Sequence, residues 1–142
     1  MSFRNPPIEA RCDLLARVRT VAVVGLSPNP ARPSHVIAAR LQAAGYRVIP
    51  VRPLVREVLG EKAYGRLAEV PGQVDLVNVF RASEHLPALA DEVIALGIPA
   101  LWAQDGIRDE AAGLRLQAAG VFAVMDECIS RDLRRCAALA PA

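Results

Sequence analysis

Apolar residues along this chain fall into two patterns, short and mostly continuous runs and longer stretches with helical spacing. The mostly continuous runs cover residues 21–25, 46–51, 74–80, 99–103 and 121–125. Such runs are typical of parallel strands that helices cover on both faces. The stretches between them predict helices over about 7–18, 34–44, 83–96, 109–119 and 129–139. The chain therefore reads as an alternation of strands and helices.

The same connection from helix to strand is expected three times. Gly45, Gly97 and Gly120 each close a helical stretch just before an apolar run, and glycine takes the left-handed backbone conformation that ends a helix at little cost. A short edge strand is expected near Ala63 and Tyr64. This order predicts an α/β fold: a single Rossmann-like doubly wound domain over residues 1–142, with a mostly parallel sheet of five or six strands and helices on both faces.

In doubly wound sheets the ligand lies beyond the carboxyl ends of the strands, where the strand order reverses. If residues 21–25 and 74–80 are the central neighbours, three loops should meet there. They are residues 25–34, 80–83 and 103–108.

The first of these loops, GLSPNPARPS, carries the chemistry of an anion site. Gly25 permits a tight turn, Ser27 offers a hydroxyl, and Arg32 can make a bidentate phosphate contact. The helix that follows begins near Pro33, and a helix N-terminus attracts negative charge. We expect the free N–H groups of the loop to point at an anion. The loop residues predicted to bind are Gly25, Ser27, Pro28, Asn29, Arg32, Pro33 and Ser34.

The end of the second strand indicates which anion. Domains that bind NAD usually carry Asp or Glu there to hold the ribose hydroxyls, whereas this chain has Arg52. An arginine favours a nucleotide with an additional ribose phosphate, which is NADP or coenzyme A. The charge distribution agrees: residues 1–56 carry nine basic and two acidic side chains, although the net charge of the chain is only +2. A segment of one sign attracts anions.

Five blocks of the sequence then resemble a known family. VAVVGLSPNPARPSHVI, GYRVIPVRP, VDLVNVFRASE, LWAQDGI and VFAVMDEC together resemble small stand-alone bacterial CoA-binding proteins of the YccU type. These are similar to the N-terminal CoA-binding domain of succinyl-CoA synthetase α subunits. The resemblance runs from about residue 15 to 128. The chain departs from the family pattern at Arg52, Pro53 and Leu54, at Glu127 and in the tail ISRDLRRC.

The resemblance implies that the chain binds coenzyme A through its 3′-phospho-ADP moiety. The loop from Gly25 would hold the phosphates, and Arg52 would lie near the adenosine. Phe80, Arg81, Gln104 and Asp105 would line the route toward pantetheine. The second synthetase domain, with its phosphorylated histidine, has no counterpart in the sequence, so synthetase activity by this chain alone is not expected. Two alternatives stay open: an NADP-binding redox or sensor module, and an interaction subunit of an acyl-CoA synthetase-like complex.

Other residues give no catalytic or metal constellation. His85 is expected to face solvent, while His35 is equally suited to a phosphate contact or to solvation. Trp102 is assigned to the core and Asp75 to a turn. Asp105 is expected to cap the turn at Gly106 or to contact ligand.

The remaining expectations concern partners and surroundings. The three cysteines, Cys12, Cys128 and Cys136, are odd in number and far apart, so no disulfide is predicted. No apolar stretch approaches the roughly 18 residues of a membrane span, and no signal peptide pattern opens the chain. We expect a cytoplasmic protein with a small-molecule ligand and without nucleic-acid or membrane binding, and leave a homodimer or a protein partner open.

Overall fold

The computed structural model describes residues 2–140, and its centre is a parallel five-stranded sheet. The strands are β1 (Thr20–Val24), β2 (Arg47–Val51), β5 (Leu76–Val79), β6 (Ala100–Ala103) and β7 (Phe122–Val124). Their order is β2-β1-β5-β6-β7. The chain therefore reverses its direction across the sheet between β1 and β5, which confirms the predicted switch point and the doubly wound α/β fold.

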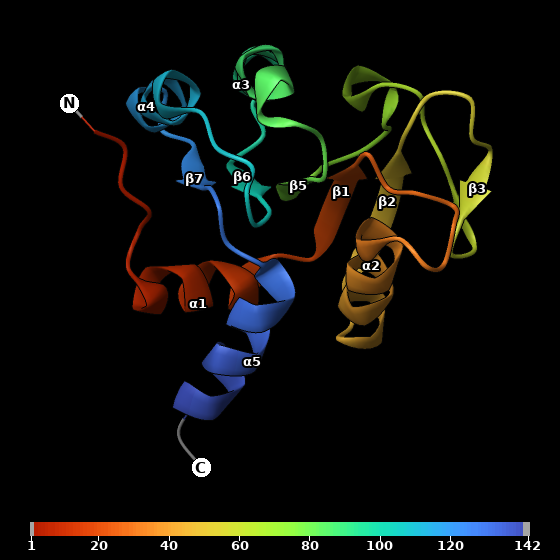
Figure 1. The fold of residues 1–142 in the computed structure, drawn as a ribbon, viewed down its shortest axis with the longest axis horizontal. Helices are drawn as coiled ribbons and strands as arrows, with labels where there is room; N and C mark the ends of the chain where they lie inside the picture. The colour runs from red at the N-terminus through yellow and green to blue at the C-terminus, as the bar shows by residue number, and fades with distance from the viewer. Residues whose placement is uncertain (1, 141–142) are drawn as a thin grey trace.

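Helices form a layer on each face of the sheet (Figure 1). One layer holds α3 (Leu86–Ala95) and α4 (Glu110–Ala118). The short 3-10 turn η2 (Ser83–His85) leads directly into α3, and a second one, η1 (Leu67–Glu69), lies before β5 in the chain. The other layer holds α1 (Ile8–Arg17), α2 (Pro33–Ala43) and α5 (Ile129–Leu139). None of the helices among residues 2–140 is long and apolar enough to cross a membrane.

Each face of the sheet has its own apolar core. Val77 and Val79 of β5 pack toward α3 and α4, whereas Leu76 packs with Leu41 of α2 and Ile129 of α5. Successive residues of a strand point to opposite faces, so a strand buried on both sides is apolar at most positions. Asn78 of β5 is buried as well, and its Nδ2 donates to the Trp102 carbonyl at 3.0 Å. Burial on both faces is the physical origin of the mostly continuous apolar runs.

The segment between β2 and β5 differs from the expected edge strand. β3 (Glu57–Val58) and β4 (Glu61–Lys62) form a small antiparallel hairpin beside the main sheet. Tyr64 then makes a single parallel bridge to Val51. The expected strand near residues 63 and 64 is thus reduced to one bridge at the β2 edge.

The prediction that the cysteines are unpaired is wrong for two of them. Cys12 of α1 and Cys136 of α5 form a disulfide across a sequence separation of 124 residues, and Cys128 is free. The two cysteines are far apart in the sequence but close in the fold, because the doubly wound topology places the first and last helices side by side on one face (Figure 1). The spacing of the cysteines alone does not indicate this placement.

Candidate functional site: a cationic cleft at the switch point

A cleft of about 660 Å³ opens at the carboxyl ends of β1, β2 and β5, between α3 and the segment around η1. Its position is the one expected for a ligand in a doubly wound sheet. Strand ends, the turn after β4 and one side of α3 all contribute to its walls. The lining residues are Val24, Gly25, Val51, Arg52, Pro53, Gly65, Arg66, Leu67, Phe80, Arg81, Ala82, His85, Leu89 and Glu92.

Gly25 lines this cleft and cannot be replaced without cost. Its φ is +87°, in the left-handed region, and a Cβ atom there would lie 2.7 Å from the carbonyl oxygen of Phe80. Its N–H donates to the Val51 carbonyl at 2.9 Å. Glycine therefore lets the ends of three strands converge, as the sequence predicted for a tight turn.

Three arginines make the cleft cationic. The Nη1 atom of Arg52 lies 3.4 Å from the Gly25 carbonyl oxygen, which holds the side chain over the strand ends. Arg81 follows β5, and its Nη2 atom lies 3.4 Å from Nε2 of His85. Arg66 precedes η1 and is exposed. None of the ion pairs formed within residues 2–140 involves these three arginines, so their charges are available to an anion.

The proline-rich loop is not arranged as the sequence suggested. The N–H of Ser27 donates to Ser34 Oγ at 2.9 Å, and that of Asn29 donates to Ser27 Oγ at 3.1 Å. The N–H groups of Arg32 and His35 donate to carbonyls of the same loop. Short polar side chains accept backbone N–H groups in this way and stabilise turns.

Among the loop N–H groups expected to face an anion, those of Ser27, Asn29, Arg32 and His35 are therefore used to shape the loop. The exception is the N–H of Ser34 at the start of α2, which has no acceptor among residues 2–140. Pro28, Asn29, Arg32 and Pro33 are exposed, whereas Ser27 and Ser34 are buried. The Nδ1 atom of His35 lies 2.9 Å from the Ser27 carbonyl oxygen, so this ring also stabilises the loop.

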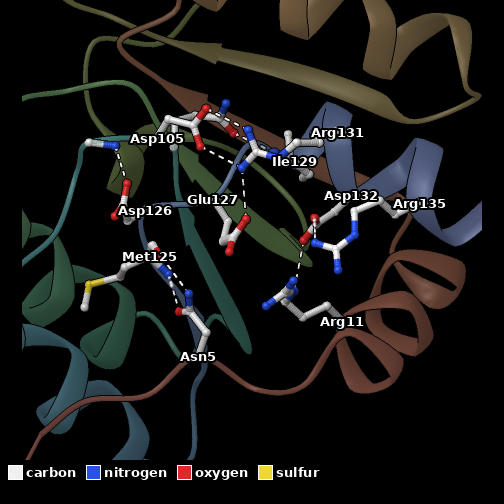
Figure 2. Close-up of polar contacts among 12 residues, drawn as sticks. Asn5, Arg11, Asp105, Met125, Asp126, Glu127, Ile129, Arg131, Asp132 and Arg135 are labelled. Carbon is white, nitrogen blue, oxygen red and sulfur yellow. Dashed lines mark hydrogen bonds and ion pairs between the residues drawn. The ribbon is translucent and has the colours of Figure 1, made fainter.

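Gln104 and Asp105 lie outside the cleft and contact α5. Gln104 is buried, and its Oε1 accepts from Asn78 Nδ2 at 3.2 Å and from the Ile129 N–H at 3.0 Å. Asp105 forms a bidentate pair with Arg131 at 2.8 and 2.9 Å (Figure 2). The hydrogen bonds from Arg131 lower the pKa of the Asp105 carboxyl below its usual range.

The turn after β6 is capped by a residue other than the one expected. The Gly106 N–H donates to Asp126 Oδ1 at 2.6 Å, so Asp126 rather than Asp105 holds this turn. Asp105 is instead bound to Arg131. Among the predicted site residues, the cleft brings together Gly25, Arg52, Phe80 and Arg81.

Sequence reasoning missed several lining residues. Gly65, Arg66 and Leu67 come from a segment with no regular pattern, and only the bridge from Tyr64 to Val51 carries it to the strand ends. His85, Leu89 and Glu92 share one face because residues three and four apart lie together on a helix. This helical spacing is the signal in the sequence that could have identified them as lining residues. The side chain of His85 is 41% exposed, which agrees with the expectation that it faces solvent, and it also lines the cleft.

Two structural expectations are confirmed. Trp102 is completely buried, and its Nε1 donates to the Glu127 carbonyl at 2.9 Å. Asp75 accepts the N–H groups of Arg19 and Thr20 at 3.0 and 2.9 Å, at the edge of the sheet opposite the cleft. Both residues thus stabilise the fold.

The fold and the cleft together define a doubly wound α/β domain with a cationic cleft at its switch point. Residues 19–134 match the family model CoA_binding_2, a CoA binding domain, and the chain belongs to this family. It is 44% identical to the uncharacterized protein YneT of Bacillus subtilis over 127 residues, which covers 89% of this chain and 94% of YneT.

Solved structures support the same fold over nearly the whole chain. A structure from Thermus thermophilus, cell-free ID.343, is 33% identical with a TM-score of 0.87, covering 92% of this chain and 99% of that one. A shorter match links the chain to subunit alpha of acetate–CoA ligase [ADP-forming] II from Pyrococcus furiosus. Identity there is 37% over 68 residues, which covers 47% of this chain and 15% of the ligase subunit.

Proposed function

We propose that this protein binds coenzyme A, or an acyl-CoA, through the 3′-phospho-ADP moiety, and that it does so in the cationic cleft. The observation that carries the proposal is the set of unpaired arginines at the switch point of a chain in the CoA binding domain family. Membership in the family supports coenzyme A as the ligand, and the unpaired arginines support the cleft as its binding site.

The charges of the cleft suit this part of the ligand. The pyrophosphate and the 3′-phosphate of CoA are strongly anionic, and an arginine guanidinium matches phosphate geometry with two parallel hydrogen bonds. Arg52, Arg66 and Arg81 surround the cleft from three separate segments. In this proposal Arg52 contacts the 3′-phosphate, while the start of α2 near Ser34 and Arg32 stabilises the pyrophosphate.

The apolar floor suits the adenosine. Val24, Val51, Leu67 and Leu89 line the same cleft between the cationic side chains, and ligand sites usually combine apolar walls with a few polar groups. In this proposal the pantetheine arm leaves across Phe80 and Arg81. In this proposal the chain alone binds the ligand without turning it over.

Calorimetric titration of CoA, 3′-dephospho-CoA, NADP and NAD tests the proposal. CoA should bind most tightly and 3′-dephospho-CoA at least tenfold more weakly, the size expected for a charged hydrogen bond. Arg52→Ala should weaken CoA and leave 3′-dephospho-CoA almost unchanged. Arg56→Ala is the matched control, because Arg56 is exposed and outside the cleft. Equal affinities for both CoA forms would remove Arg52 from the 3′-phosphate, and a preference for NADP would favour a redox or sensor module instead.

The partial match to an acetate–CoA ligase subunit favours a second candidate, a domain that works with a partner in an acyl-CoA synthetase-like complex. Gel filtration of a native extract with detection by antibody tests this. Elution as part of a larger complex would support it, and elution at the mass of a monomer or homodimer would contradict it.

A further inference from the structure

Glu92 is the only carboxylate among the described residues that line the cationic cleft. It lies on α3, and no ion pair within residues 2–140 includes it. A carboxylate beside a phosphate site weakens anion binding by repulsion unless it contacts another part of the ligand. The position of this carboxylate therefore calls for a hydrogen-bond donor on the ligand.

The helix sets the distance between the two kinds of charge. His85 is the last residue of η2, directly before α3, and Glu92 lies seven residues further on in α3. Both line the cleft, and seven residues correspond to about 10 Å at the rise of an α-helix. His85 lies beside Arg81, at the cationic end. Leu89 lies between the two and contributes to the apolar floor. The wall formed by α3 thus passes from cationic through apolar to acidic.

We propose that Glu92 determines base specificity by accepting a hydrogen bond from the exocyclic amino group of adenine. This inference rests on the proposed function, since it assumes that the anionic end of the nucleotide lies at the arginines. A nucleoside presents its phosphate at one end and its base edge at the other, with an apolar ring face between them, which is the order found along α3. A carboxylate only accepts hydrogen bonds, so it selects an amino group over a carbonyl at that edge.

The ribose is the other part of the ligand that could donate to a carboxylate. Its 2′-hydroxyl is adjacent to the 3′-phosphate, so a carboxylate bound there would lie close to the arginines that hold this phosphate. Glu92 forms no ion pair with Arg52, Arg66 or Arg81, and it lies about two helical turns from the cationic end of α3. This placement favours the base.

Titration of two bisphosphates tests the inference: adenosine 3′,5′-bisphosphate, and inosine 3′,5′-bisphosphate, in which a carbonyl replaces the amino group. Wild-type protein should prefer adenosine by about tenfold or more, because the inosine carbonyl faces the carboxylate. Glu92→Gln should reduce this preference to within about threefold, since an amide can donate as well as accept. Glu9→Gln on α1, an exposed residue outside the cleft, is the matched control and should keep the wild-type preference.

The outcomes separate this inference from the proposed function. If both bisphosphates bind equally to wild-type protein, or if Glu92→Gln keeps the full preference, the role of Glu92 is wrong while CoA binding stands. Wild-type protein could instead bind 2′-deoxyadenosine 3′,5′-bisphosphate more weakly than the ribose form, with no such difference in Glu92→Gln. That result would assign Glu92 to the ribose and overturn the inference. If neither these compounds nor CoA binds, both proposals fail. Unchanged melting temperatures of the variants establish that the fold is retained.

Discussion

The molecule uses arginine in two different ways on the two faces of its sheet. In the cleft on the α3 side, Arg52, Arg66 and Arg81 have no carboxylate partner among residues 2–140. Around the junction of α1 and α5, three arginines are each paired with a carboxylate, and we call this group the helix seam. The seam consists of Arg11, Asp105, Glu127, Arg131, Asp132 and Arg135 (Figure 2).

Pairing determines whether an arginine stabilises the fold or remains able to bind a ligand. In the seam, Arg11 Nε lies 2.9 Å from Asp132 Oδ2, and both side chains are buried. Two charges removed from water stay charged only when they compensate each other. In the cleft the arginines are partly exposed and have no carboxylate partner among residues 2–140. Their positive charges can therefore attract an anionic ligand. The seam should therefore govern stability, and the cleft should govern affinity.

The largest expected effect comes from breaking the buried pair of the seam. Arg11→Met removes the buried partner of the Asp132 carboxylate and leaves it the longer contact with the half-exposed Arg135, at 3.4 Å. The variant should lower the free energy of unfolding by about 3–5 kcal/mol. Urea denaturation measures this change. The double variant Arg11→Met with Asp132→Leu should recover most of the loss, because it removes both charges. A double variant as unstable as the single one would contradict this account.

The stability lost in Arg11→Met should depend on pH, and the pKa of Asp132 sets the direction. Burial raises the pKa of the Asp132 carboxyl above its usual value of 3.8, although Arg11 opposes this. The native state then binds the proton more tightly than the unfolded chain, so the ionised carboxylate costs stability at neutral pH. The cost should diminish as the pH falls through the raised pKa, and the gap between the single and double variants should narrow there.

The disulfide that joins α1 to α5 is the second test of the comparison. It closes a loop across 124 residues, and constraining so long a loop in the unfolded chain contributes about 2–5 kcal/mol. Replacing Cys12 and Cys136 by serine should lower stability by this amount and leave CoA affinity unchanged. Cys128→Ser, at the free cysteine, is the matched control. A loss of affinity in the double variant would mean that the seam and the cleft are coupled.

The sequence predicted those parts of the fold that depend on local pattern. The five main strands follow the apolar runs, and Gly45, Gly97 and Gly120 end helices with positive φ as expected. The pairing of Cys12 with Cys136 was missed because it depends on which helices share a face, and no local pattern encodes that. The same holds for Arg11, whose partner Asp132 lies near the other end of the chain.

The lining residues of the cleft that could be predicted from the sequence are those that directly follow strands. Gly25, Arg52 and Arg81 come just after β1, β2 and β5, so the topology alone brings them together. Arg66 was missed because its segment has no regular pattern. The loop at Ser27 was interpreted as a set of free donors, but its own hydroxyl and amide side chains bind them. Sequence reasoning of this kind places residues at the end of a sheet but does not assign their hydrogen bonds.

The smallest effect is expected from a matched pair of arginine substitutions, one from each group. Arg131→Gln breaks the contacts with Asp105 and Glu127 but should cost only about 1 kcal/mol or less, because these side chains are partly exposed and screened by solvent. Arg66→Gln should leave stability unchanged and weaken CoA binding about tenfold. Urea denaturation and calorimetry on both variants test this, and an exchange of the two phenotypes would break the comparison.

The loss in Arg131→Gln should also depend on pH with a defined sign. Arg131 lowers the pKa of Asp105 below 3.8, so the native state binds this proton less tightly than the unfolded chain does. The stabilisation is then complete above the unfolded pKa and disappears as the pH falls through the lower native value. This direction is opposite to that of Asp132. A stability difference between wild type and Arg131→Gln that stays constant from neutral pH to below this range would show that the Asp105 pair contributes no charge-dependent stability to the seam.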